Sequence, residues 1–268
     1  MLSQNDLEHL CCKTCTVVIQ AAQFIEAQFG QVQHNAIEEK SLNNLVSYVD
    51  KTAESILIEG LQPLLPEAAF LVEEQTVAWH SSDYLWVVDP LDGTTNFLHN
   101  LPWFAVSVGL QYKGTDIMGI VYDVMNRQLY YAWLGGGAYL QGQRLHVSST
   151  TTLQQSLLVT GFPYYDYSKS APYLQLLNHL TQATRGIRRL GSAALDLVYV
   201  AKGTFEVFYE YSLQPWDVVG GAVIVREAGG MVSDFSGKPD YITPKEIVAS
   251  NTLVHTEFIR LTQRFFVV

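Results

Sequence analysis

The stretch that decides the fold is Trp86-Val87-Val88-Asp89-Pro90-Leu91-Asp92-Gly93-Thr94-Thr95-Asn96-Phe97. The apolar run 84–88 predicts a buried strand, and Pro90 is expected to stop its hydrogen-bond ladder just after the carboxylate of Asp89. Gly93 then opens a helix, whose first N–H groups suit an anion. Carboxylates at a strand end suit a hard divalent cation such as Mg²⁺. A strand, a turn and a helix cap would explain the same Asp-Pro and Asp-Gly pairs without any chemistry.

A second acidic segment lies far along the chain, at residues 215–230. Its apolar middle predicts a buried helix, because a helix that is apolar on every side belongs in a core. Asp217 lies at or near the N-cap of this helix, where a carboxylate is common for structural reasons alone. A third acidic group, the pair Glu73-Glu74, follows the short apolar run 69–72. Acids that repeatedly follow strands favour metal-assisted hydrolysis of a phosphate ester over turns and caps alone.

Together these segments resemble the inositol monophosphatase family of Mg²⁺-dependent, lithium-sensitive phosphatases. Residues 89–97 match the first signature of the family with no departure, and residues 216–230 match its second signature closely. The similarity covers nearly the whole chain and is weakest in the N-terminal helix and at the C-terminal end. The resemblance implies a layered α-β-α-β-α sandwich. Runs of predicted strands followed by alternating strands and helices suggest an N-terminal α+β half, residues 1–145, and a C-terminal α/β half, residues 146–268. The site would lie where the halves meet.

The resemblance also implies a set of metal ligands. Family members bind metal through the first acid of a Glu-Glu pair, both aspartates and a carbonyl of the first signature, and the aspartate of the second. In this sequence these ligands are the carboxylates of Glu73, Asp89, Asp92 and Asp217 and the backbone oxygen of Leu91. They would hold two to three Mg²⁺ ions per site, for which Mn²⁺ could substitute. Asp89 would bridge two of the ions.

The other site residues implied by the resemblance bind the attacking water, the phosphate and the alcohol. Thr94 would join Glu73 in orienting and deprotonating the water, and Asp50 would support Thr94. The backbone amides of Gly93 and Thr94 would hold phosphate oxygens. In full, the substrate would contact Asp92, Gly93, Thr94, Ala193 and Glu210. Of these residues, Glu210 matches one that contacts substrate hydroxyls in inositol phosphatases.

Two positions near the implied site qualify the resemblance. Val72 stands where family members commonly have glycine, and its side chain is expected to alter how a third, loosely held ion binds. Lys40 falls near a family lysine that lies on a mobile loop. The segment around Lys40 is polar and is expected to be mobile here as well. None of the direct carboxylate ligands is missing from the sequence.

Hydrophobic periodicity predicts the remaining elements. Helices are expected over residues 6–29, 49–61, 172–184, 190–201 and 252–263, in addition to the second signature helix. Strands are expected over residues 70–72, 84–88, 105–111, 116–122, 128–133, 157–160, 205–209, 231–234 and 247–249. The basic cluster Arg185, Arg188 and Arg189 is expected on a solvated or partner-facing surface, with a phosphate site as the alternative. Residues 164–167, rich in tyrosine, fit either a sugar pocket or a surface loop.

The bulk composition limits the class of protein. The chain has 268 residues, of which 48% are hydrophobic, and a net charge of −10. Such a chain is globular, and its negative charge argues against nucleic acid or an anionic membrane as a partner. The N-terminus lacks the basic region of a signal peptide, and no run approaches the roughly 20 apolar residues of a transmembrane helix. Three cysteines in one segment, Cys11, Cys12 and Cys15, favour a reducing cytoplasm over a disulfide framework.

Three functions remain open from the sequence. The leading hypothesis is Mg²⁺-dependent hydrolysis of myo-inositol monophosphate or a similar small polyol phosphate, and Glu210 favours a polyol. The same chemistry could act on 3′-phosphoadenosine 5′-phosphate, fructose 1,6-bisphosphate or histidinol phosphate. A non-catalytic metal-binding scaffold is the third hypothesis, against which the complete set of ligands argues. The expected partner is a small phosphate ester, and the resemblance implies a homodimer.

Overall fold

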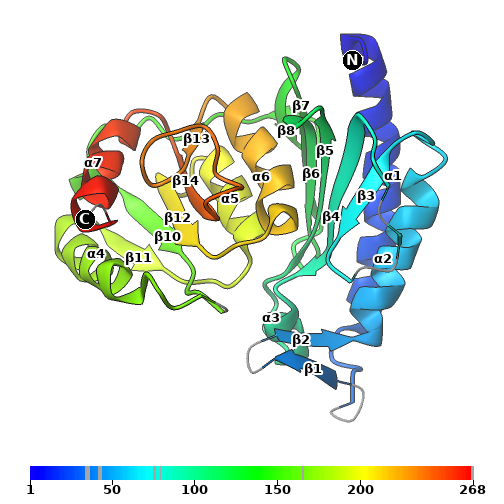
Figure 1. Ribbon diagram of the computed structural model, residues 1–268, viewed down its shortest axis with the longest axis horizontal. Coiled ribbons are helices and arrows are strands. Elements are labelled where there is room, and N and C mark those ends of the chain that lie inside the picture. The colour runs from blue at the N-terminus through cyan, green and yellow to red at the C-terminus, as the bar shows by residue number, and fades with distance from the viewer. Residues whose placement is uncertain (34–36, 42–43, 75–76, 79, 165, 267–268) are drawn as a thin grey trace.

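The computed structural model describes residues 1–33, 37–41, 44–74, 77–78, 80–164 and 166–266. Its main elements form five layers (Figure 1). From one outer face to the other, these are helices α1 (Gln4–Gln28) and α2 (Tyr48–Leu61), a seven-stranded sheet, helices α5 (Ala193–Ala201) and α6 (Pro215–Glu227), a five-stranded sheet, and helices α4 (Ser170–Ala183) and α7 (His255–Phe266). The predicted α-β-α-β-α sandwich is therefore confirmed.

The seven-stranded sheet has the order β3-β4-β5-β6-β7-β8-β9. Its strands are β3 (Ala69–Val72), β4 (Tyr84–Asp92), β5 (Ala105–Tyr112), β6 (Thr115–Asp123), β7 (Gln128–Trp133), β8 (Gly137–Leu140) and β9 (Gln143–Arg144). Only the pairing of β3 with β4 is parallel, and every later strand pairs antiparallel with the strand before it. This is the arrangement of an α+β fold.

The five-stranded sheet has the order β11-β10-β12-β14-β13. Its strands are β10 (Leu157–Thr160), β11 (Gly186–Arg188), β12 (Val207–Tyr211), β13 (Met231–Ser233) and β14 (Glu246–Ser250). A 3₁₀ turn (Leu153–Gln155) precedes β10, which runs parallel to both of its neighbours. The edge strand β11 was missed by the sequence analysis, because three residues carry too little periodicity to be recognised.

A small hairpin lies between α1 and α2, where the sequence predicted no strands. It consists of β1 (Ile37–Ser41) and β2 (Asn44–Ser47), which pair antiparallel. The short helix α3 (Thr94–Leu98) lies beside β2 (Figure 1). Lys40 belongs to β1, and its side chain lies outside the described residues.

Strand β4 does not stop at Pro90, as the sequence predicted, but continues to Asp92. Asp89 lies opposite Ser107 and Asp92 lies opposite Ala105, so three steps along β4 match two steps along β5. Such a bulge tolerates a residue that cannot donate a hydrogen bond. The other neighbour, β3, has already ended at this level. The bulge therefore carries both aspartates on one continuous strand.

Several other element boundaries differ from the prediction, and two of the differences have a clear local cause. Helix α5 begins at Ala193 rather than at residue 190, because Gly191 has a φ of 94° and Ser192 caps the helix. Strand β12 begins two residues late, because the amides of Thr204 and Phe205 still bond to the carbonyl of Tyr199 at the end of α5. The last helix, α7, begins at residue 255 instead of residue 252.

Helix α6 packs closely on the large sheet, and all eight residues 218–225 are buried, as predicted. A Cβ atom added at Gly119 of β6 would lie 2.1 Å from the carbonyl oxygen of Gly220 on α6. Only glycine at position 119 permits this approach. The contacts of α6 with β4, β5 and β6 bring its N-terminus toward the end of β4.

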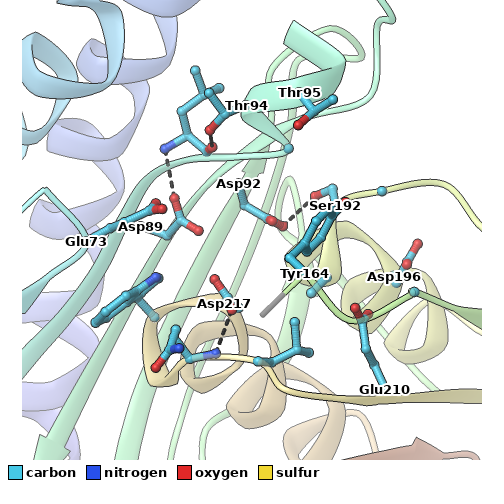
Figure 2. Close-up of a pocket in the computed structure, with 18 of the residues that line it drawn as sticks. Glu73, Asp89, Asp92, Thr94, Thr95, Tyr164, Ser192, Asp196, Glu210 and Asp217 are labelled. Carbon is cyan, nitrogen blue, oxygen red and sulfur yellow. Dashed lines mark hydrogen bonds between the residues drawn. The ribbon is translucent and has the colours of Figure 1, made fainter. Parts of the chain in front are cut away.

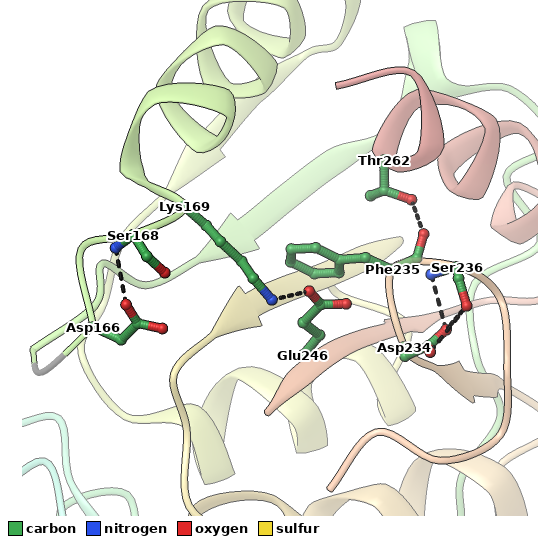
Figure 3. Close-up of polar contacts among 8 residues, drawn as sticks. All are labelled: Asp166, Ser168, Lys169, Asp234, Phe235, Ser236, Glu246 and Thr262. Carbon is green, nitrogen blue, oxygen red and sulfur yellow. Dashed lines mark hydrogen bonds and ion pairs between the residues drawn. The ribbon is translucent and has the colours of Figure 1, made fainter. Parts of the chain in front are cut away.

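The outer helices of the second sheet are held by polar side chains (Figure 3). Lys169, just before α4, forms an ion pair with Glu246 of β14. Thr262 of α7 is buried and donates a 2.6 Å hydrogen bond to the carbonyl oxygen of Phe235. Among the described residues, no helix combines the length and the apolar character that crossing a lipid bilayer requires.

Candidate active site

A cavity of about 590 Å³ opens between the two sheets. Carboxylates dominate its lining, namely Glu73, Glu74, Asp89, Asp92, Asp196, Glu210 and Asp217. Within the described part of the chain, Arg189 is the single cationic side chain that lines it. Figure 2 shows Glu73, Asp89, Asp92 and Asp217 on one side of the cavity and Asp196 and Glu210 toward the other.

The bulged end of β4 supplies Asp89 and Asp92. Asp89 is only 2% exposed, and its Oδ1 atom accepts a 2.9 Å hydrogen bond from the amide of Leu91. Burial raises the pKa of Asp89 well above its usual range, and the neighbouring charges of Glu73, Asp92 and Asp217 raise it further. Several acids that oppose one another's ionisation require a positive charge among them if all are to be ionised.

Asp92 connects the end of β4 to the N-terminus of α5. Its Oδ2 atom accepts hydrogen bonds from the Ser192 hydroxyl at 2.5 Å and from the Ala194 amide at 2.7 Å. Burial raises the pKa of Asp92 to about 6, although these two bonds act in the opposite direction. Because Ser192 also caps α5, the same residue orders the helix and orients the carboxylate.

Asp217 is the third residue of α6, and the N-cap is Gln214. The Asp217 carboxylate accepts a 2.7 Å hydrogen bond from the Gln214 amide in a capping box. Burial and the nearby charge of Asp92 raise the pKa of Asp217 to about 7. The capping role expected from the sequence and a place at the cavity therefore coexist in one side chain.

Thr94 begins α3 after Gly93, whose φ of 97° suits glycine. The Thr94 hydroxyl lies 2.9 Å from the Leu91 carbonyl oxygen and 3.1 Å from Asp50 Oδ1 and can donate to either. Asp50 is 2% exposed, and burial raises its pKa. Asp50 does not line the cavity, so it can affect a bound molecule only through Thr94.

Glu73 lines the cavity directly after β3, and Val72, the last residue of that strand, is buried. The adjacent Glu74 also lines the cavity, and its amide donates a 2.8 Å hydrogen bond to Glu54 of α2. This contact anchors the chain at the mouth of the site. The expected influence of Val72 on a third ion stays a prediction.

The opposite wall comes from the second sheet and α5. Glu210 of β12 is 5% exposed, and a Cβ atom added at Gly161 would lie 2.1 Å from both of its carboxylate oxygens. Ala193 lines the same wall. The carboxylate of Glu210 therefore packs directly against the backbone of Gly161, where a side chain would collide with it.

Several residues that line the cavity lie outside the set of site residues predicted from the sequence. Arg189, expected on a solvated surface, lines the cavity, and its guanidinium donates a hydrogen bond to the Tyr164 hydroxyl. Tyr164 lines the cavity as well, one of the two alternatives open for its segment. Asp196, which no motif covers, lies four residues after Ser192 on the same helix face. The helical spacing from Ser192 is the one signal that could have indicated it.

The donors on the metal side of the cavity are all oxygens, which is the ligand type that Mg²⁺ prefers. The mutual repulsion around Asp89 also fits a bound cation. No three His, Cys, Asp or Glu side chains in the described ranges stand close enough together to form a closed set of metal ligands. The site therefore fits a hard cation in the type of its donors and not in their present spacing.

Known proteins agree with this architecture. A model of the inositol monophosphatase family matches residues 6–265. The chain is 37% identical over 253 residues to an inositol-1-monophosphatase of Mesorhizobium japonicum, covering 92% of this chain and 95% of that protein. It is 42% identical over 222 residues to a Pseudomonas aeruginosa protein named Nus factor SuhB, covering 81% and 82%.

A solved structure extends the similarity to the fold. The inositol monophosphatase from Anabaena (Nostoc) sp. PCC 7120 superimposes with a TM-score of 0.85 at 33% identity and covers 97% of each chain. Both signatures thus lie within a match that spans nearly the entire sequence. The chain belongs to the inositol monophosphatase family.

Proposed function

We propose that the protein hydrolyses a small phosphate monoester with the help of Mg²⁺, and that myo-inositol monophosphate is the substrate that fits best. The observation that carries this proposal is the gathering of Glu73, Asp89, Asp92 and Asp217 on one side of a cavity. The short helix α3 begins at the same place. A family whose members include an inositol-1-monophosphatase supports the choice of reaction.

Mg²⁺ would be held by these four carboxylates and by the Leu91 carbonyl oxygen. Bound Mg²⁺ would make a water molecule more acidic and neutralise charge on the phosphate and the leaving oxygen. In our proposal, Glu73 and the Thr94 hydroxyl orient the attacking water. Asp50 keeps the Thr94 hydroxyl in place through the 3.1 Å contact. The number of ions and the substitution of Mn²⁺ for Mg²⁺ stay predictions.

The phosphate would be held at the start of α3. The first amides of a helix have no acceptor within the helix, so those near Gly93 and Thr94 are suited to phosphate oxygens. A Cβ atom added at Gly93 would come within 3.2 Å of Trp103, Phe104 and Gly191 atoms. Because position 93 is a glycine, the backbone can pack closely against these residues where it lines the cavity.

The alcohol would extend toward Ala193 and Glu210. A buried carboxylate accepts hydrogen bonds strongly, which suits substrate hydroxyls more than an apolar leaving group. This wall supports an ester with free hydroxyls, such as inositol monophosphate, over histidinol phosphate, which has none. Histidinol phosphate, fructose 1,6-bisphosphate and 3′-phosphoadenosine 5′-phosphate remain the alternative substrates.

The test is phosphate release by the purified protein from each of these four esters with Mg²⁺ present. We expect the highest kcat/KM for inositol 1-phosphate. A clear preference for one of the other three esters would keep the chemistry and replace the substrate. No hydrolysis of any of them would overturn the proposal and favour the scaffold hypothesis.

A second candidate function comes from the relatives named Nus factor SuhB. We propose that this protein also has a role of that kind and that the role does not require catalysis. The net charge of −10 does not favour direct contact with nucleic acid in such a role. The test is expression of the wild type and Asp217→Asn in Pseudomonas aeruginosa lacking its own SuhB. Equal rescue by both would support a non-catalytic role, whereas rescue by the wild type alone would tie the role to catalysis.

A homodimer and a cytoplasmic location also stay predictions. Light scattering coupled to gel filtration tests the first: a mass near twice 30.0 kDa is expected, and a mass near 30.0 kDa would contradict it.

A further inference from the structure

One acceptor in the cavity has no partner. The Oδ1 atom of Asp196 is buried and has no hydrogen-bond donor among the described residues. The residue as a whole is 1% exposed and lines the cavity (Figure 2). An unpaired buried acceptor costs free energy. Oδ1 has almost no accessible surface, so a donor from a bound molecule would remove that cost once the Asp196 side chain turns toward the cavity.

The helix that carries Asp196 directs it toward the substrate side. Ser192 caps α5 and binds Asp92, and Asp196 follows four residues later on the same helix face. The first residue of this turn, Ala193, also lines the cavity. Asp196 therefore lies on the same wall as Ala193, across from the carboxylates of β4 (Figure 2).

Glu210 and Asp196 share this wall with Arg189. The charge of Glu210 raises the pKa of Asp196 beyond the effect of burial, so the two carboxylates are close enough to repel one another. The guanidinium of Arg189 acts in the opposite direction on both acids. Arg189 thus already provides a positive charge near Asp196 and Glu210. The hydrogen-bond donor that Asp196 lacks is therefore best supplied by a neutral group such as an alcohol.

We propose that Asp196 is a specificity-determining residue that accepts a hydrogen bond from a substrate hydroxyl, beside the hydroxyl that Glu210 would accept. The substrate class is then a phosphate monoester of an alcohol with at least two further hydroxyl groups. This inference rests on the proposed phosphatase function and goes beyond it, because neither sequence signature includes Asp196.

The experiment compares two esters with similar aliphatic leaving groups, inositol 1-phosphate and ethyl phosphate, the second of which has no free hydroxyl. Asp196→Ala is expected to lower kcat/KM on inositol 1-phosphate about 10- to 100-fold, mainly through KM, because the substrate hydroxyl would be left in a buried place without its acceptor. On ethyl phosphate the same variant should stay within about threefold of the wild type. Asp196→Asn, which keeps an acceptor oxygen, should lose less.

Equal losses on both esters, or no loss on either, would overturn the inference. If Asp196→Ala does not fold, Asp196→Leu, which has a similar shape and also lacks an acceptor, takes its place in the comparison. A third ester, 2-aminoethyl phosphate, tests whether Asp196 binds a neutral donor or a cation. If Asp196→Ala lowers kcat/KM more on this ester than on inositol 1-phosphate, Asp196 binds a cation instead.

Failure of the proposed function gives a different experimental result from failure of the inference about Asp196. If the wild type hydrolyses ethyl phosphate but no inositol 1-phosphate, the proposed substrate is wrong, and glucitol 6-phosphate then replaces it in the comparison. A wild type that prefers neither polyol ester over ethyl phosphate would overturn the role of Asp196 as well.

Discussion

The carboxylate of Asp92 and the hydroxyl of Ser192 meet at 2.5 Å, although 100 residues separate them in the sequence. Asp92 ends a strand of the large sheet, and Ser192 caps the helix that begins the middle layer. The bond therefore fixes the proposed metal-binding strand relative to the proposed alcohol-binding wall. A cavity made from two separate sheets needs such a contact to keep its two sides in register.

Replacing Ser192 with alanine tests this contact. We expect Ser192→Ala to lower kcat about tenfold, because Asp92 loses an orienting hydrogen bond. Unfolding free energy should fall by about 1 kcal/mol, because the α5 cap is lost. Ser192→Thr keeps the hydroxyl and should restore both quantities. Steady-state kinetics and urea unfolding measure them, and a variant with wild-type kcat would show that Asp92 needs no support from α5.

Asp50 offers a test that separates catalysis from stability. Its Oδ1 atom contacts the Thr94 hydroxyl, whereas its Oδ2 atom accepts the amide and the hydroxyl of Ser47 in a helix cap. Asp50→Ala should lower both kcat and the melting temperature. Ser47→Ala removes capping contacts and should lower only the melting temperature. If both variants lose the same fraction of kcat, Asp50 acts on catalysis through the fold and not through Thr94.

Gly161 should matter for the substrate alcohol. A Cβ atom at position 161 would collide with both carboxylate oxygens of Glu210, so Gly161→Ala should displace that carboxylate. We expect KM for inositol 1-phosphate to rise about tenfold in Gly161→Ala and in Glu210→Gln. The double variant should be little worse than either single variant, because both changes remove the same interaction. Fully additive losses would disprove a shared cause.

His255 should control stability in mild acid. It is 4% exposed, and its two ring nitrogens contact the hydroxyls of Ser233 and Ser250. Burial lowers its pKa to about 4. The unfolded chain, with an ordinary histidine pKa near 6.5, binds the proton first. The stability that this residue contributes is therefore present above about pH 6.5 and is lost as the pH falls toward 4.

Urea unfolding at pH 7 and pH 5 measures this effect. Between these values the wild type should lose about 2 kcal/mol more than His255→Gln. The cavity carboxylates titrate in both proteins, so they cancel in the difference. The same pH dependence in both proteins would mean that His255 is not the titrating group.

Most of the individual helices and strands and the acidic side of the cavity could be predicted because those features are local, whereas the layered arrangement was implied by the family resemblance. Asp89, Asp92 and Thr94 lie in one short motif, and Asp217 lies in another. Pro90 misled the prediction because a bulge, which depends on the partner strand β5, accommodates a proline inside β4. No pattern in the sequence around Pro90 indicates this bulge.

Residues of the opposite wall were harder to predict because tertiary contacts place them. Arg189 resembled a surface arginine in the sequence, and only the approach of Tyr164 and α5 makes it part of the cavity. Asp196 lies in an apolar helix with no motif around it. Its buried Oδ1 atom, which has no hydrogen-bond partner among the described residues, can be identified only once the second sheet and α5 are packed together.

The most direct test of the account is phosphate release from inositol 1-phosphate by the wild type and by Asp217→Asn, across a Mg²⁺ titration and in excess chelator. We expect wild-type turnover of about 1 s⁻¹ or more, lost with chelator and restored by Mg²⁺. Asp217→Asn keeps an acceptor for the Gln214 amide and should remain folded, with a rate at least about 100-fold lower. Wild-type turnover that persists in chelator, or an Asp217→Asn variant as fast as the wild type, would contradict the account.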